Sequence, residues 1–274
     1  MGKGIIEILA AYDVPKDGRL KVLGPAGCKP RAWDESGKAI KLTRVKSLSY
    51  SLSGYWCEIS EFMGAARVRL KLDLVPDDAE NLSFLFFGCS WLANVARIDG
   101  TGCAKSLMSA FNGCESLKSL PMFEVGQCED FGAFAFRCKN LECVPLLDTS
   151  RGMNFSAMFE NCPSLESVPK LDTSKGIDFN SMFAYCPNLA GVPLLDTHNG
   201  VDFTAMFINC TKLASVPKLD TSNGKDFTRM FNGCEVLKYV PVQSVARGAR
   251  VHAMFAGCPN LESVPEWAKG LNVA

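Results

Sequence analysis

The residues with the widest chemical scope in this sequence are its 13 cysteines, since thiols bind metals, form disulfides and act as nucleophiles. Eight of them recur at a fixed interval, the first two 25 residues apart and the others 24 apart. No C-x2-C pair of the kind used by zinc sites is present, and cysteine is often fully buried. We therefore predict a buried structural ladder that consists of Cys89, Cys114, Cys138, Cys162, Cys186, Cys210, Cys234 and Cys258.

The five cysteines outside this ladder are Cys28, Cys57, Cys103, Cys128 and Cys143. Cys128 occupies a position where later repeats have glycine, and Cys103 falls in or next to that position one repeat earlier. If the two stack, their Cβ atoms lie about 4.8 Å apart, which is marginally too far for a relaxed disulfide. We therefore expect two separate surface thiols, with a Cys103–Cys128 disulfide as the alternative and the one pairing to test.

Aspartates form two further series at the same interval. Aligned carboxylates could hold calcium between repeats. They could equally accept hydrogen bonds from nearby N–H groups, as N-caps before phenylalanine and as Asx turns in the Leu-Asp-Thr triplets. Asn154 replaces aspartate in one series, which favours capping, so we predict no metal and no cofactor. The series are Asp130, Asp178, Asp202, Asp226 before phenylalanine, and Asp148, Asp172, Asp196, Asp220 in the triplets.

The sequence shows little that is typical of a catalytic site. The two histidines, His198 and His252, lie at different positions of different repeats, and no phosphate-binding loop, HExxH or dinucleotide-binding glycine pattern occurs. We expect a protein that is not an enzyme.

The elements that position these residues follow from the repeat itself. Leucine follows each ladder cysteine by three residues, and phenylalanine precedes it by three in seven of the eight repeats. From the second repeat on, proline follows by seven. The consensus is DFxxMFxxCxxLxSVPxLDTSxG, and a unit this short must stack on its neighbours to bury its apolar face.

We predict an α/β repeat fold, a solenoid of about eight 24-residue coils. Each coil has a short parallel strand over LxSVPxL, which proline limits to two to four residues, and one or two helical turns over DFxxMFxxC. The turn glycines Gly176, Gly200 and Gly224 indicate positive φ angles.

At these positions the chain resembles the leucine-rich repeats of the BspA type. Residues 110–117, Ala-Phe-Asn-Gly-Cys-Glu-Ser-Leu, match the core of that unit, and the Met-Phe and VPxLDTS variants are similar to repeats of bacterial surface proteins and phage tail-associated proteins. The resemblance covers about residues 68–274 and departs from the family in the proline seven residues after the cysteine. It implies a leucine-rich-repeat solenoid that binds a protein partner or a cell-surface ligand.

The ends of the chain differ from the repeats. Short β-prone runs separated by turn signals predict a small β-rich N-terminal cap or attachment domain over residues 1–65. Residues 66–274 form the expected solenoid, with a C-terminal cap at about 262–274 where Trp267 and Leu271 could fold over the last coil.

The strand face of the solenoid exposes residues four, five and eight after each ladder cysteine. Its charge is mixed and it includes one large aromatic residue, so it indicates no polyanion and no particular sugar. The residues that we expect to bind a partner are Glu142, Glu166, Lys170, Leu194, Lys218, Lys238 and Tyr239.

Composition excludes several classes of protein. Lys+Arg and Asp+Glu both number 29, which excludes a polybasic nucleic-acid-binding protein. No run approaches the roughly 20 apolar residues that a membrane-spanning helix needs, so we expect no membrane insertion. The N-terminus lacks the pattern of a secretory signal peptide, so the chain either is not secreted by that route or has lost its signal.

Two settings fit these features. In the first, the chain is a bacteriophage virion component, tail or fibre-like, that residues 1–65 attach and whose repeats serve host recognition. The N-terminal domain could also join copies into a homo-oligomer. In the second, it is a bacterial cell-surface adhesion protein whose signal peptide has been removed. An intracellular protein-interaction module is a minor third alternative.

Overall fold

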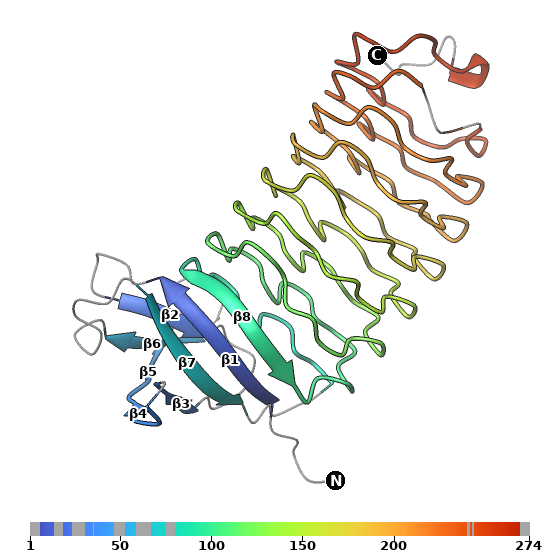
Figure 1. Cartoon of the computed structure of the whole chain (residues 1–274). Coiled ribbons are helices and arrows are strands. Elements are labelled where there is room, and N and C mark those ends of the chain that lie inside the picture. Colours follow the sequence, from blue (N-terminus) through green and yellow to red (C-terminus); the bar gives the residue numbers. More distant parts are fainter. Residues whose placement is uncertain are drawn as a thin grey trace.

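The structure is a computed structural model of the 274-residue chain. It describes residues 6–13, 19–23, 31–34, 36–46, 53–58, 67–74, 80–239, 242 and 244–268. Within these ranges two antiparallel sheets near the N-terminus are followed by a stack of coils (Figure 1). The predictions on Cys28 and Leu271 lie outside the described residues.

The N-terminal sheets are small and antiparallel. In the larger one, β4, β3, β7 and β1 lie side by side, and β2, β6 and β5 form the other. Alternation along β1 buries Ile8, Ala10 and Tyr12, whereas Leu9 is 43% exposed. The strands are β1 (Ile6–Asp13), β2 (Arg19–Leu23), β3 (Arg31–Trp33), β4 (Ala39–Ile40), β5 (Thr43–Lys46), β6 (Ser53–Glu58) and β7 (Arg67–Leu74).

The first coil joins the larger sheet. Its strand β8 (Leu92–Asp99) pairs antiparallel with β1, which therefore lies between β7 and β8. Just before this strand, the N–H of Asp13 donates to the carbonyl of Trp91 at 2.8 Å. The sheet thus includes β7 and β8, which lie beyond residue 65, and it covers the first end of the stack (Figure 1).

Proline explains why later coils have no strand like β8. The first coil has Ala96 seven residues after its ladder cysteine, where the other coils have proline. Because proline has no N–H donor, it is excluded from strand interiors. In the described coils after the first, this segment forms only isolated parallel bridges, such as those of Ser119 with Cys143 and Gly191 with Ser215. The pairing is shorter than the predicted two to four residues.

The regular contact between coils lies in the other half of the repeat. Alternate N–H groups there donate to the next coil, as Phe131 does to the carbonyl of Asn154 at 2.9 Å and Ala133 to that of Ser156 at 2.7 Å. Each coil therefore depends on its neighbours for backbone hydrogen bonds. Parallel bridges begin this segment and connect one position of successive coils: Asn81, Ser106, Asp130, Asn154, Asp178, Asp202, Asp226 and Arg250.

The segment predicted to be helical is a series of overlapping turns. Short turns follow one another along this segment. In one of them, the N–H of Phe134 donates to the carbonyl of Phe131 at 3.1 Å. Left-handed residues interrupt any right-handed helix five residues and one residue before each ladder cysteine, for example Ala133 with φ of 51° and Arg137 with φ of 59°. The Phe-x3-Phe-x2-Cys spacing still presents one apolar face, but it does so without a helix.

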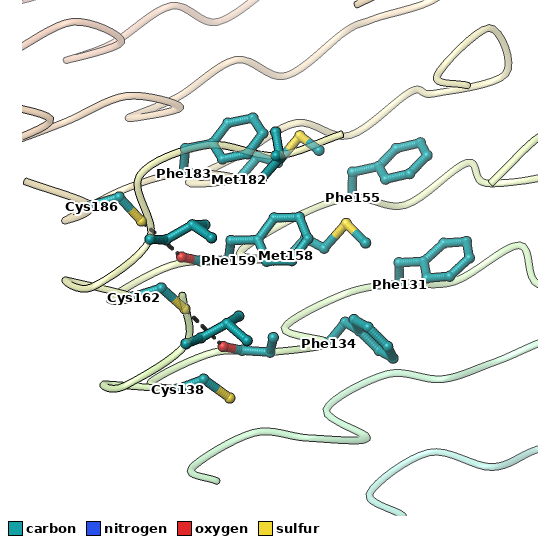
Figure 2. Close-up of a cluster of buried hydrophobic side chains, with 14 of the residues drawn as sticks. Phe131, Phe134, Cys138, Phe155, Met158, Phe159, Cys162, Met182, Phe183 and Cys186 are labelled. Carbon is teal, nitrogen blue, oxygen red and sulfur yellow. Dashed lines mark hydrogen bonds between the residues drawn. The ribbon is translucent and has the colours of Figure 1, made fainter. Parts of the chain in front are cut away.

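Phenylalanines and cysteines form the core of the stack (Figure 2). The rings of Phe155 and Phe179 are 5.8 Å apart and nearly parallel, at 9°. On the cysteine side, the thiol of Cys186 donates to the carbonyl of Phe159 in the preceding coil at 3.1 Å. The same Sγ–H contact recurs from Cys114 to Cys258, so the ladder thiols lie against the backbone of the neighbouring coil.

At the C-terminal end, Trp267 folds back on the preceding coil. It lies in a 3-10 turn, η2 (Glu266–Ala268), and its Nε1–H donates to the carbonyl of Val242 at 3.4 Å. Ala268 is buried beside it. No helix in the described part of the chain is long and apolar enough to cross a membrane.

The turn glycines are required for packing, and the prediction of positive φ is wrong. Gly176, Gly200 and Gly224 do not have left-handed φ angles. The phenylalanine three residues later lies directly against each Cα, so that a Cβ on Gly200 would overlap Cζ of Phe203. These positions therefore lack a side chain because an aromatic ring occupies its place.

We predict that Gly200→Ala lowers the free energy of unfolding by about 1–3 kcal/mol, the usual cost of overpacking a core. Urea unfolding followed by circular dichroism measures this. Gly191→Ala is the matched control, because a Cβ there meets only the carbonyl of Ser215, at 3.8 Å. Equal stability of the two variants would contradict the packing role.

We also predict that native protein reacts with a thiol reagent at Cys103 and Cys143, which are exposed, well before the buried cysteines. Burial raises the pKa of Cys138 and of Cys186 to about 12, so the reactive thiolate is scarce at pH 8. Alkylation followed by peptide mass spectrometry locates the labels. Rapid native labelling of Cys138 or Cys186 would rule out the buried ladder.

Candidate partner-binding groove

A groove crosses successive coils along the Leu-Asp-Thr triplets. It has a volume of about 1030 Å³ and is lined by residues 146–149, 170–174, 194–197 and 218–222 together with Ser244. We call it the LDT groove. Four coils contribute the same four positions to it, so four rows of side chains run along the stack.

The floor of the LDT groove consists of leucine and threonine. The hydroxyl of Thr149 donates to the carbonyl of Asp172 in the next coil at 2.9 Å, and Thr173 donates to Asp196 at 2.8 Å. The threonines are buried, so these bonds hold neighbouring coils in register. The buried leucines of the floor are Leu147, Leu171, Leu195 and Leu219.

One wall of the groove is a row of aspartates held by the predicted Asx turns. Asp148 Oδ1 accepts from the N–H of Ser150 at 3.1 Å and from its hydroxyl at 2.7 Å. Asp196 contacts His198 Nδ1 at 2.6 Å in the equivalent turn. The turns fix the direction of each carboxylate. The wall comprises Asp148, Asp172, Asp196 and Asp220.

These hydrogen bonds keep the wall negatively charged. The hydroxyl of Ser150 is the largest cause of the lowered pKa of Asp148. The other three wall aspartates have lowered pKa values for the same reason, with a serine or, for Asp196, a histidine as the partner. All four carboxylates are therefore ionised at neutral pH.

Leucine and lysine alternate at the position two residues before each wall aspartate, and we call this row the rim. In coil order it reads Leu146, Lys170, Leu194, Lys218. Leu146 and Leu194 are 68% and 65% exposed, so both present an apolar side chain to the groove. The groove thus combines exposed apolar side chains, two cations and a row of anions.

A second aspartate series lies outside the groove and differs from the wall. Asp178 Oδ1 accepts from the N–H of Asn180 at 2.9 Å, as the predicted cap does, although no helix follows. Partial burial is the main cause of the raised pKa of Asp178, and the neighbouring carboxylate of Asp202 adds to it. Among the described residues, no group of three or more His, Cys, Asp or Glu side chains is placed to hold a metal ion.

The structure divides the residues predicted to bind a partner. Lys170, Leu194 and Lys218 line the LDT groove. The other four are exposed but do not line it, so their role stays a prediction; they are Glu142, Glu166, Lys238 and Tyr239. Sequence reasoning missed the wall, because its aspartates were assigned only to turns. The signal that could have shown it is an exposed leucine or lysine two residues before aspartate in four successive repeats.

Cys103 and Cys128 are not bonded to one another in the structure. Ser106 bridges to Asp130, so the residue that stacks on Cys128 is Ala104, and Cys103 is one residue out of register. The Cys128 thiol points inward and donates to the carbonyl of Asp130 at 3.2 Å, whereas Cys103 is exposed. The register therefore does not stack the two cysteines, and of the two predicted surface thiols only Cys103 is exposed.

Both histidines are exposed. His198 is exposed in a groove-wall turn, where its ring contacts Asp196 and the side-chain amide of Asn199. His252 is exposed in a later coil.

Comparison with protein families identifies relatives of the repeats. The family model described as "Mycoplasma protein of unknown function, DUF285" matches residues 104–191 and 129–245. Together the matches span residues 104–245, just over half of the chain.

The chain belongs to this family. The overlap of the two matches reflects the repeat, because their starts at residues 104 and 129 differ by about one coil and the same family pattern fits in two registers. No curated protein and no solved structure matches the chain. The DUF285 match includes every residue that lines the LDT groove, from Leu146 to Ser244.

We predict that Asp148 and Asp172 titrate below the ordinary aspartate pKa and that Asp178 titrates above it. Lowered values for Asp148 and Asp172 mean that their stabilising contribution is present at neutral pH and is lost as the pH falls through their folded-state pKa. The pKa of Asp178 is raised, so as the pH falls this carboxylate is protonated before those of Asp148 and Asp172, and its unfavourable buried charge is removed. Carboxyl ¹³C NMR titration measures each midpoint, and overlapping midpoints would contradict the assignment.

Proposed function

We propose that the chain is a non-enzymatic repeat protein that binds a protein partner in the LDT groove. The observation that carries the proposal is the pair of exposed leucines, Leu146 and Leu194, on the rim of a groove that spans several coils. Apolar side chains exposed beside a few oriented polar groups are typical of binding sites. Repeat proteins generally recognise partners through such extended surfaces.

The proposal includes the fold class. A leucine-rich-repeat solenoid of the BspA type is supported by the 24-residue interval, by the parallel bridges between equivalent positions of successive coils and by membership of the DUF285 family. The turns that replace the expected helical segments leave this class in place, because the stacking of coils and not the helix defines it.

The setting that we propose is a bacteriophage virion, with a bacterial cell surface as the alternative. The N-terminal sheets would attach the chain, and the coils would project the LDT groove toward the host. Continuity between sheet and stack through β1 and β8 supports such a rigid projection. Immunogold electron microscopy of purified phage particles and of intact cells tests the setting: labelled tails support the virion, and labelled cell envelopes alone overturn it.

We predict that the double variant Leu146→Ser/Leu194→Ser loses its protein partner. Immobilised wild-type and variant chains are incubated with host-cell extract, and retained proteins are quantified by mass spectrometry. The expected result is at least one protein retained by the wild type and depleted about tenfold or more on the variant, since each buried leucine contributes about 1.5–3 kcal/mol.

The matched control for this experiment is Met153→Ser/Ile177→Ser, which removes two exposed apolar side chains outside the groove. It should retain the same partner as the wild type. Equal recovery of every protein on all three chains would count against partner binding in the groove.

A further inference from the structure

The rim of the LDT groove repeats every two coils, although the backbone repeats every coil. Leu146 and Leu194 are separated by Lys170, and Lys170 and Lys218 by Leu194. At the usual spacing of hydrogen-bonded chains, about 4.8 Å, two coils advance about 10 Å along the stack. A ligand that uses both leucines must therefore present apolar groups about 10 Å apart on one face.

This spacing distinguishes between peptide conformations. A β-strand brings side chains back to the same face every two residues, about 6.7 Å, which matches neither one coil nor two. A polyproline II helix has three residues per turn and rises about 3.1 Å per residue, so every third side chain recurs on one face at about 9.3 Å. That period fits the rim.

An α-helix also brings side chains back to one face at a similar distance, about 10.5 Å for every seventh residue, so spacing alone does not separate it from polyproline II. The two conformations differ in their backbone, because α-helix carbonyls are bonded within the helix whereas those of polyproline II are free. Lys170 and Lys218 on the rim need free acceptors, which favours polyproline II.

The charges of the groove specify the remaining chemistry. The lining includes four wall carboxylates and two rim ammonium groups, so it has an excess of negative charge. A polyproline II segment makes no internal hydrogen bonds, so its carbonyls can accept from Lys170 and Lys218. Basic side chains of the segment can in turn pair with the aspartate wall.

We infer that the LDT groove binds a polyproline II segment of its partner, with an apolar residue at every third position and basic residues between. This inference rests on the proposed function and specifies the ligand class of the same site. The wall turns and the threonine bonds to the next coil hold the lining in place before the ligand arrives, which limits the entropy lost on binding.

Fluorescence anisotropy with the full chain and labelled twelve-residue peptides tests the inference. The probe is (Leu-Pro-Lys)4, which adopts polyproline II and places leucine at every third position. The comparison peptides are a scramble of the same composition without that spacing, and (Leu-Pro-Glu)4. We expect the probe to bind about tenfold or more tightly than either comparison peptide. Equal affinity for probe and scramble overturns the inference.

Two variants connect binding to the groove. Leu146→Ser/Leu194→Ser should weaken the probe about tenfold, and Asp172→Asn/Asp196→Asn should weaken it and reduce its salt dependence. Met153→Ser/Ile177→Ser should leave affinity unchanged, and unaltered binding by the groove variants overturns the inference. If a natural partner depends on the two leucines but the probe does not bind, the ligand class is wrong and the proposed function stands.

Discussion

The backbone hydrogen bonds between coils are the constraint on which the rest of the structure depends. Donors such as Phe131 and Ala133 have their acceptors in the next coil, so a coil in isolation leaves them unsatisfied. Left-handed residues such as Ala133 add a cost of about 1–2 kcal/mol each, which burial of phenylalanines at about 1.5–3 kcal/mol each offsets only in the stack. The stability of each coil therefore depends on contact with its neighbours, and the N-terminal sheet takes the place of the coil that would precede the first one.

Residue spacing predicted the repeat length and the burial of the ladder thiols, except that Cys258 is only partly buried, because both depend on apolar side chains at a fixed interval. It placed the hydrogen bonding between coils in the wrong half of the repeat, and it predicted helical turns where the structure has turns with left-handed residues. Alanine and serine at positions such as Ala133 and Ser181 have no preference for positive φ, so nothing in the residue types marked the left-handed turns. The register of Cys103 was equally hidden, because a 25-residue interval does not show where its extra residue lies.

Only part of the groove could be predicted from the sequence, for a similar reason. Rim residues such as Lys170 and Leu194 could be predicted as exposed from their offset to the ladder, but the wall required three-dimensional information. The same aspartate closes an Asx turn and forms part of the groove wall. At Asp148, the hydrogen bond that closes the turn also fixes the direction of the carboxylate and lowers its pKa. In the four coils that contribute to the wall, one aspartate thus closes a turn and lines the groove.

The two-coil alternation of the rim has a consequence for how such genes change. Repeat arrays gain and lose units by recombination between similar segments, and the backbone accepts a single 24-residue unit because each coil contacts only its neighbours. Insertion of one unit between Lys170 and Leu194 would preserve the stack but would shift every later leucine out of phase with those before it. Only duplication in pairs would extend the groove without altering the alternation of its rim, so inheritance of units by twos would be the genetic trace of selection on the rim.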